Sequence, residues 1–345
     1  MMQDTIMRNK SLIRFLTLFV ILTIGYSCGN KPKAPNVKHI SDEVVIRRFD
    51  ADLFNLTSGE IQWDELVGLR NKYGEFYDLY MEKIANLARA DDTAGVNYIR
   101  DFLNDPDMKS IYSETQKIFG DFSSQESKLH KAAQYYRYYF PDHYVPQVIT
   151  YFFGFNYAVV ATDSAACIAL DQYLGKDFKY YNHLPDYIRA RKDPAYLVTD
   201  LMRGWAMTEF ERDEPRADLM DEMIFQGKIM YFLEHVLPFE HDSVLMGYSQ
   251  KQLTYCKENE WNIWSYFVEN KLLYSKNFTD ISKYTGEAPF SAGMPRETPG
   301  RTGIWTGWQI VKAYAKNHKK ITLQEIMNEH DYKKILNKSN YKPKR

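Results

Sequence analysis

Apolar residues recur at helical spacing through the first part of the chain. Residues 63–73 and 76–87 each place apolar side chains three and four positions apart. The run Asn-Asp-Pro-Asp at 104–107 is typical of the end of one helix and offers caps for the next. Two more helical segments are expected in residues 108–139. The pattern therefore predicts a helical half over residues 41–140.

The pattern changes after Pro141. Residues 145–153 and 157–161 are rich in β-branched and aromatic residues, and the Gly-Phe-Asn run between them indicates a hairpin. Residues 166–170 are a candidate third strand. Helical spacing then returns, most clearly in 196–210, 217–237, 250–274 and 303–317.

These elements predict an α+β fold that is predominantly α-helical, with one small antiparallel sheet near the middle. We expect a single globular domain over residues 41–345. Its second half, with the sheet and the later helices, covers 141–332. A basic tail, 333–345, has six basic and no acidic residues and is expected to be solvated; the alternative is that it contacts anionic envelope material.

The first residues resemble the signal of a bacterial lipoprotein. Basic residues precede a short uncharged run, and Gly-Tyr-Ser-Cys at its end resembles a lipoprotein box. We expect 1–27 to be a signal peptide, Cys28 to carry the lipid and 28–40 to be a flexible tether. Gly29 is not the Asp associated with inner-membrane retention, so the predicted location is the outer membrane. No acidic run follows Cys28, which favours the periplasm-facing side, and the surface-exposed side is the alternative. The alternative is an ordinary cleaved signal with an incidental cysteine.

Composition excludes some classes of function. The chain has 345 residues, with 44 Lys+Arg against 45 Asp+Glu, so we expect no nucleic acid partner. Three cysteines are too few for a disulfide scaffold, and the sequence leaves open whether Cys167 and Cys256 pair.

The sequence contains no familiar catalytic motif. HExxH, GxSxG, GxGxxG and the Walker loop are missing, and no two histidines lie four positions apart. We therefore expect no catalytic residue, no metal and no cofactor. The acidic pairs Asp221/Glu222 and Glu234/Glu240 leave a hydrolase of the cell envelope as one alternative. The 27 Tyr and 6 Trp leave a peptidoglycan- or carbohydrate-binding module as another.

One predicted helix, 217–237, is apolar on most of its surface. Its narrow polar edge includes Glu222, Gln226 and Lys228. This edge is either the solvated side of a core helix or a recognition face.

A second helix begins after a Pro-Gly turn. Gly303 and Gly307 lie four positions apart, which costs about 1 kcal/mol per Gly relative to Ala and predicts a close approach to the backbone. Arg301 lies at the start of this helix, and Trp305 and Trp308 lie on its other faces. Helix packing explains the pattern; alternatively, Arg301 clamps a carboxylate in a pocket.

Short segments spread over the mature chain resemble one known family. In chain order they are Arg48-Phe49-Asp50, the run 170–175, the run 225–232, Met246-Gly247-Tyr248, Trp264, Ala288-Pro289-Phe290, Pro299-Gly300-Arg301-Thr302-Gly303 and Tyr341-Lys342-Pro343. They are similar to the GldB family of gliding-motility lipoproteins. The resemblance implies an envelope lipoprotein needed for gliding over surfaces and associated with type IX secretion.

The same family is distantly similar to predicted zinc peptidases of the zincin type. That similarity implies a metal helix at 196–210, where Thr199, Asp200 and Arg203 stand in place of the ligand motif. Gln226 would replace the glutamate of a later Glu-Gly. The histidines and the glutamate that would bind zinc are therefore absent at these positions. The similarity thus implies a degenerate zincin-like architecture and a pseudoenzyme.

The resemblance thus implies a non-enzymatic component that binds other envelope proteins of the gliding and secretion apparatus. A groove left by a lost metal site would suit such binding. The candidates for its lining are Glu222, Gln226, Lys228, Arg301, Trp305 and Trp308.

Overall fold

The computed structural model describes most of the chain, namely residues 34–56, 60–86, 94–210 and 218–345. Contacts divide the chain into two units, 1–36 and 37–345. The second unit is the body described below.

The N-terminal predictions fall largely outside the described residues. The predicted signal peptide, 1–27, lies wholly outside them, and so does Cys28. Within the predicted tether, Val37 is buried, and the Ile40 carbonyl accepts a hydrogen bond of 3.0 Å from the Gln134 amide. The last tether residues therefore pack on the body.

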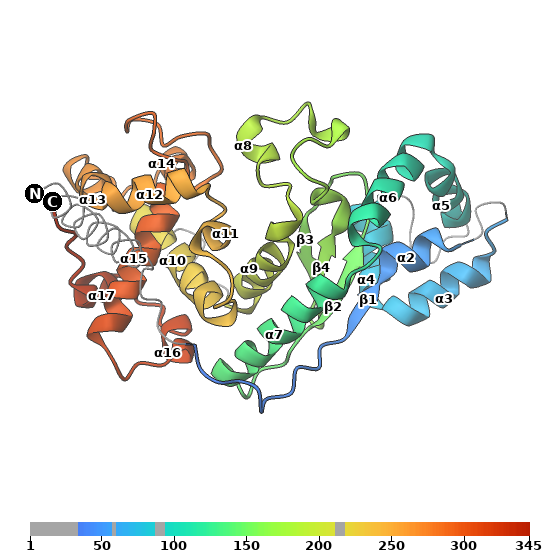
Figure 1. Ribbon diagram of the computed structural model, residues 1–345, viewed down its shortest axis with the longest axis horizontal. Helices are drawn as coiled ribbons and strands as arrows, with labels where there is room; N and C mark the ends of the chain where they lie inside the picture. The colour runs from blue at the N-terminus through green and yellow to red at the C-terminus, as the bar shows by residue number, and fades with distance from the viewer. Residues whose placement is uncertain (1–33, 57–59, 87–93, 211–217) are drawn as a thin grey trace, which may run out of the picture. The chain divides into compact units, whose positions relative to one another are not determined.

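Helices make up most of the body, and Figure 1 shows their arrangement. The α-helices are α2 (Phe49–Phe54), α3 (Trp63–Tyr73), α4 (Glu75–Leu79), α5 (Ala94–Asn104), α6 (Pro106–Phe119), α7 (Ser123–Tyr139), α8 (Asp186–Arg189), α9 (Leu197–Glu209), α10 (Leu219–Val236), α11 (Asp242–Met246), α12 (Gln250–Glu258), α13 (Glu260–Glu269), α14 (Phe278–Thr285), α15 (Thr302–Asn317), α16 (Leu323–Met327) and α17 (Tyr332–Ser339). A π-helical turn, η1 (Tyr80–Ile84), and three 3-10 turns, η2 (Leu170–Gln172), η3 (Lys179–Tyr181) and η4 (Pro194–Tyr196), connect them. The strands are β1 (Ile46–Arg48), β2 (Gln147–Tyr151), β3 (Val159–Ala161) and β4 (Ala165–Ala169).

The helix-dominated α+β class and the longer helices are confirmed. The predicted helix at 196–210 is α9, and the one at 303–317 is α15. The predicted single helix at 250–274 is two helices, α12 and α13, which meet at Asn259.

The sheet differs from the predicted one because it is mixed, with the strand order β1–β2–β4–β3. β2 runs parallel to both β1 and β4, and β3 is antiparallel to β4. The all-antiparallel arrangement and the hairpin between 145–153 and 157–161 are therefore wrong. Both edges of β2 are occupied by parallel partners, and its inner residues are buried, as is usual for parallel strands.

A buried carboxylate holds the chain where the hairpin was expected. The Asp171 carboxylate accepts hydrogen bonds from the backbone N–H of Phe155 at 2.8 Å and of Phe153 at 3.5 Å. Burial raises the pKa of this carboxyl to about 6. These bonds satisfy the backbone of the turn after β2, so the turn does not need to pair as a hairpin.

The aromatic core of the N-terminal part surrounds Phe49. Its ring lies 4.7 Å from the ring of Tyr80 and 4.9 Å from that of Tyr73, in edge-to-face geometry. The neighbouring Arg48 forms a two-pronged ion pair with the buried Asp50, at 3.0 and 2.8 Å. Thr150 of β2 also donates to Asp50, which ties α2 to the sheet.

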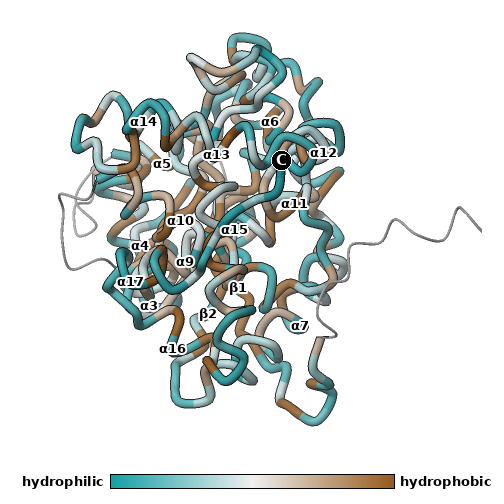
Figure 2. The backbone as a smooth tube through the Cα atoms, turned by 90° about the vertical axis from the view of Figure 1, so that its left-hand side faces the viewer, coloured by the Kyte–Doolittle hydropathy of each residue, from teal (hydrophilic) through white to brown (hydrophobic). Residues whose placement is uncertain are grey.

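α9 lies between the sheet and α10, and α15 packs against the other side of α10 (Figure 1). In Figure 2 these three helices occupy the centre of the view, where brown, hydrophobic residues are frequent. α10 is buried on nearly all sides, as its apolar sequence predicts.

The glycines of α15 make the close approach that the sequence predicts. A Cβ on Gly307 would lie 1.7 Å from the Met223 carbonyl oxygen of α10. A Cβ on Gly227 of α10 would lie 2.2 Å from the Gly307 carbonyl carbon. The two backbones are therefore in contact, and helix packing is the explanation of this glycine pattern.

The basic C-terminal segment is not the solvated tail that the sequence suggested. It forms α17, which packs on α15 and buries Ile335 fully. Beyond the helix, the Tyr341 hydroxyl donates to Glu260 at 2.9 Å, and its ring meets the Trp264 ring at 5.2 Å. The lysines leave enough apolar positions at helical spacing for one face of α17 to be buried.

Gly307→Ala is expected to lower the free energy of unfolding by about 2–3 kcal/mol, because the added methyl group forces α15 away from α10. Gly68→Ala in α3 is the matched control, since no atom lies within 4 Å of its added Cβ. The control is expected to gain up to about 1 kcal/mol from helix propensity. Urea unfolding of both variants measures the difference, and equal stabilities would contradict a backbone contact at Gly307.

Candidate functional site

The two tryptophans of α15 are core residues and line no groove. Trp305 and Trp308 are each 1% exposed. The Trp308 indole donates to the Glu234 carboxylate at 3.0 Å, and Lys312 pairs with the same carboxylate at 3.0 Å. The prediction that these rings face a groove is therefore wrong.

The polar edge of α10 does not form one recognition face. Gln226 donates to Glu222 at 3.0 Å across one turn of the helix. Lys228 is 2% exposed, and its ammonium donates to the Glu329 carbonyl at 2.9 Å. Burial lowers the pKa of Lys228 to about 8. Lys228 thus joins α10 to the segment before α17 and is not available to a partner.

The acidic pairs considered for a hydrolase have structural roles. Asp221 completes the capping box of α10 with Asp218. Glu234 lies in the Trp308–Lys312 network, and Glu240 pairs with Lys128 at 2.6 Å.

Three arginines and two carboxylates converge near the start of α15, and we call this group the arginine cluster. Its members are Arg191, Asp200, Arg203, Glu287 and Arg301. Arg191 follows α8, Asp200 and Arg203 lie on α9, Glu287 follows α14, and Arg301 precedes α15. The cluster therefore joins the region 191–203 to the region 287–301, which are far apart in sequence.

Asp200 organises the inner side of the arginine cluster. Its Oδ1 lies 3.0 Å from Arg191 Nη2 and 3.9 Å from Arg203 Nε. Its Oδ2 accepts a hydrogen bond of 3.2 Å from the Tyr173 hydroxyl. Arg203 also donates to the Leu245 carbonyl, so it connects α9 to the end of α11.

Glu287 lies on the outer side of the arginine cluster. Its Oε1 is 3.2 Å from Arg191 Nη1 and 3.3 Å from Arg301 Nη1. The Glu287 side chain is 42% exposed, whereas that of Arg301 is 7% exposed. The two arginines thus lie inside the body, and the carboxylate that faces them reaches the solvent.

Arg301 is held by the backbone at the end of α11. It adopts a left-handed conformation with φ +60°, and its guanidinium donates to the Met246 carbonyl and, at 3.4 Å, to the Gly247 carbonyl. A Cβ on Gly247 would lie 2.3 Å from Arg191 Nη1 and 3.0 Å from Arg301 Nη2. A side chain at this position would therefore displace one of the two guanidinium groups.

The electrostatics of the arginine cluster are those of a partly compensated buried charge. Burial lowers the pKa of Arg203 to about 10, and burial together with the nearby Arg191 lowers the pKa of Arg301. Burial also acts to lower the pKa of Arg191, but Asp200 and Glu287 outweigh it and raise that pKa. All three groups remain cationic at neutral pH, so this group of five has three positive and two negative charges.

A family comparison decides what the chain is related to. The family model described as gliding motility protein GldB matches residues 30–343. The chain belongs to the GldB family of gliding motility proteins. No curated protein and no solved structure was found to match the chain.

Membership of the GldB family implies a part in gliding motility. The family match does not test the implied similarity to zincins, which stays a prediction. Thr199, one of its replaced positions, is fully buried on α9. Among the described residues, no group of three or more His, Cys, Asp or Glu side chains is placed to hold a metal ion. Within the same residues, no helix has the length and apolar content needed to cross a membrane.

Several segments that carry the resemblance to GldB proteins meet at the arginine cluster. Tyr173 comes from the run 170–175, and Met246-Gly247-Tyr248 surrounds the Arg301 guanidinium. The Tyr248 hydroxyl donates to the Gly300 carbonyl at 2.5 Å. A Cβ on Gly300 would lie 2.3 Å from the Ala288 carbonyl oxygen. These short motifs therefore form one packed unit around Arg301.

The sequence selected part of this site. Asp200, Arg203 and Arg301 were candidates, and the structure brings them together. Arg191 and Glu287 were missed, because neither stands in a motif with a chemical signature. The only signal near Glu287 was its position next to the Ala-Pro-Phe segment of the family resemblance.

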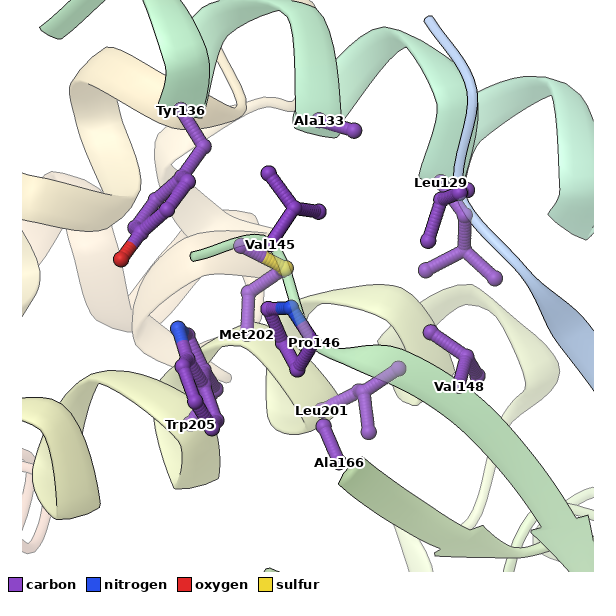
Figure 3. A pocket seen from close by; sticks show the side chains of 11 residues that line it. Leu129, Ala133, Tyr136, Val145, Pro146, Val148, Ala166, Leu201, Met202 and Trp205 are labelled. Carbon is purple, nitrogen blue, oxygen red and sulfur yellow. The ribbon is translucent and has the colours of Figure 1, made fainter. Parts of the chain in front are cut away.

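A small cavity elsewhere in the body is apolar. It lies between α7, α9 and the strands β2 and β4, and Figure 3 shows the aliphatic and aromatic side chains that line it. Its volume is about 20 Å³, close to the space that one water molecule needs. The cavity is too small for a ligand and is a packing defect of the core.

The two remaining cysteines are also core residues. Cys167 in β4 and Cys256 in α12 are buried and unpaired with each other. Burial raises the pKa of the Cys256 thiol to about 12. Neither thiol is therefore poised to act as a nucleophile at neutral pH.

Asp200→Asn is expected to lower the free energy of unfolding by about 3 kcal/mol, because three guanidinium groups would then face one exposed carboxylate. The matched control is Asp78→Asn, which removes a surface ion pair with Arg70 whose side chains are about 40% exposed. Its expected cost is at most about 1 kcal/mol. Thermal or urea unfolding compares the two, and similar costs would show that the cluster does not hold the body together.

Lys228→Met is expected to alter how stability depends on pH. Between pH 8 and 10.5 the unfolded chain keeps the Lys228 proton while the folded chain releases it, so the stability of wild type relative to the variant rises with pH. The rise is at most about 3 kcal/mol, and the difference is constant below pH 8. Urea unfolding at pH 7 and pH 10 measures it, with Lys117→Met at an exposed site as control. A pH-independent difference for Lys228→Met would contradict its burial.

Proposed function

We propose that this GldB-family chain is a membrane-anchored lipoprotein of the cell envelope. In this proposal, residues 1–27 are removed, Cys28 carries the lipid, and the body lies on the periplasmic side of the outer membrane. The lipoprotein-like start of the sequence supports the anchor. The family match supports association with the envelope, since the matching family is named for lipoproteins.

We further propose that the protein is a non-enzymatic component that supports gliding and type IX secretion by binding other envelope proteins. The observation that carries this is the composition of the arginine cluster. A guanidinium stays protonated in proteins, so it binds anions and positions groups but does not act as a general base. The carboxylate best placed to act, Asp200, has both oxygens engaged by Arg191 and Tyr173.

The buried position of the cluster also favours binding over a purely structural role. Ion pairs in the interior add little net stability, because the loss of hydration offsets the attraction between the charges. A set of three arginines is thus not explained by stability alone. Recognition of an anionic group on a partner is the use to which arginine is best suited.

Cys28→Ser in a gliding host is expected to abolish lipid labelling, to release the protein from the membrane fraction, and to stop colony spreading. Ser27→Ala is the matched control, because alanine is small enough to keep the cleavage site while the cysteine remains. Metabolic labelling with an alkyne fatty acid, cell fractionation and a colony-spreading assay check the three effects, and measurement of secreted protein checks secretion. Normal spreading and secretion by the Cys28→Ser strain would contradict the anchor. Turnover of a peptide or glycan that one carboxylate substitution abolishes would contradict the non-enzymatic role.

A further inference from the structure

We propose that Arg191 and Arg301 form a receptor for a carboxylate group of a partner protein, and that Glu287 fills this receptor while no partner is bound. The inference rests on the proposed partner-binding function and names the chemistry of the partner. Glu287 is then an internal substitute that a carboxylate from outside displaces.

The contacts of Glu287 are those of an occupant that can leave. Both of its ion pairs use the single oxygen Oε1, at 3.2 and 3.3 Å. By contrast, Asp50 receives Arg48 with both oxygens, at 3.0 and 2.8 Å, and is fully buried. The best geometry between arginine and a carboxylate is two-pronged and near 2.8 Å. Glu287 therefore leaves part of the binding capacity of the two arginines unused.

Two buried donors of the arginine cluster lack a well-aligned acceptor. Arg191 Nη1 and Arg203 Nε are buried, and among the described residues neither has a hydrogen-bond acceptor in good geometry. A guanidinium has five N–H donors in a fixed fork, and leaving buried donors unpaired is costly. A better-placed carboxylate at the position of Glu287 would pair the Arg191 donor and gain the free energy that the present contact does not supply.

The arginines do not depend on Glu287 for their positions. Asp200 holds Arg191 through Nη2, and the ring of Tyr196 lies 5.7 Å from the Arg191 guanidinium carbon. Met246 accepts from Arg301, whose guanidinium carbon lies 5.6 Å from the Tyr248 ring. Both groups are thus held on one side by carboxylate or carbonyl oxygens and an aromatic ring. They stay in place when Glu287 leaves, and such preorganisation favours binding.

The surrounding charge favours an anion. Without Glu287, three arginines face Asp200 alone, and the nearby Lys192 and Asp171 contribute one charge of each sign. The N-terminus of α15 follows Arg301 directly and adds the positive end of a 16-residue helix dipole. The present occupant is a carboxylate, so we assign the site to this group, which acidic side chains and the C-termini of proteins both supply.

The test measures peptide binding by the full-length lipidated protein in detergent micelles, with fluorescence anisotropy of labelled pentapeptides. One peptide has glutamate side chains and an amidated C-terminus, the second has glutamine side chains and a free C-terminus, and the third is neutral at both. Glu287→Gln is compared with wild type and with Glu114→Gln. Glu114 is the matched control, because it is 41% exposed and pairs with Lys117 at 2.6 Å on the surface.

Glu287→Gln is expected to bind at least one carboxylate peptide about tenfold more tightly than wild type, with no gain for the neutral peptide. Glu114→Gln is expected to bind as wild type does. Adding Arg191→Gln to Glu287→Gln is expected to return the affinity to that for the neutral peptide. The peptide that gains affinity identifies the source as an acidic side chain or a C-terminus.

Three results would overturn the proposal. The first is equal binding of acidic and neutral peptides by Glu287→Gln, and the second is the same gain in Glu114→Gln, which would reflect net charge alone. The third is displacement of the peptide by inorganic phosphate at concentrations where acetate has no effect, which would assign the site to phosphate. If Glu287→Gln does not fold, the melting temperature of the wild type is measured with each peptide at equal ionic strength. An acidic peptide that raises this temperature no more than the neutral peptide does would also overturn the proposal.

These results are separate from the test of the proposed function. No gain in peptide affinity, with gliding lost in Cys28→Ser, would remove the receptor and leave the anchored partner-binding role. Tight carboxylate binding, with normal gliding in Cys28→Ser, would remove the anchored role and leave the receptor.

Discussion

The contact between the backbones of α10 and α15 is the constraint on which the C-terminal part of the body depends. Gly227 and Gly307 remove the side chains that would otherwise separate the helices. Because α15 is fixed on α10 at this crossing, its first residues are fixed beside α11, which follows α10 in the chain. Arg301 therefore reaches the Met246 and Gly247 carbonyls. A packing requirement in the core thus determines where a buried cation can be placed.

Two of the buried ion groups among the described residues compensate the loss of hydration in different ways. Arg48 and Asp50 satisfy each other with two short bonds, and Thr150 completes the pair. Such a pair is closed to solvent on the carboxylate side and has a structural role. The arginine cluster instead keeps one more cation than anion, and its outer carboxylate is exposed. Burying an excess charge is unfavourable unless a group from outside can compensate it.

Sequence reasoning predicted the features that depend on local periodicity. The helices 196–210 and 303–317, the close approach at Gly303 and Gly307, and the helix-dominated class follow from spacing within one segment. The strand order did not follow, because β1 reaches β2 across about a hundred residues and no local pattern records that pairing. For the same reason Arg301 was a candidate while its partner Glu287, on a separate loop, was not. The basic composition of 333–345 predicts a solvated tail, whereas the apolar residues of α17 at helical spacing bury one face of it on α15.

Arginine and lysine have different roles in this body, and their chemistry explains the difference. Lys228 is buried against a carbonyl, where burial lowers its pKa to about 8, so its charge depends on pH. The arginines of the cluster keep their charge under the same burial, because the ordinary pKa of a guanidinium is far higher. The proposed carboxylate receptor, because it is built from arginine, therefore stays cationic at neutral pH. Tyr196 and Tyr248 hold the two guanidinium groups through their ring faces, which leaves the outward N–H groups for a ligand. Lysine, whose charge is a single point on a flexible stem, would provide neither the permanent charge nor the fixed fork.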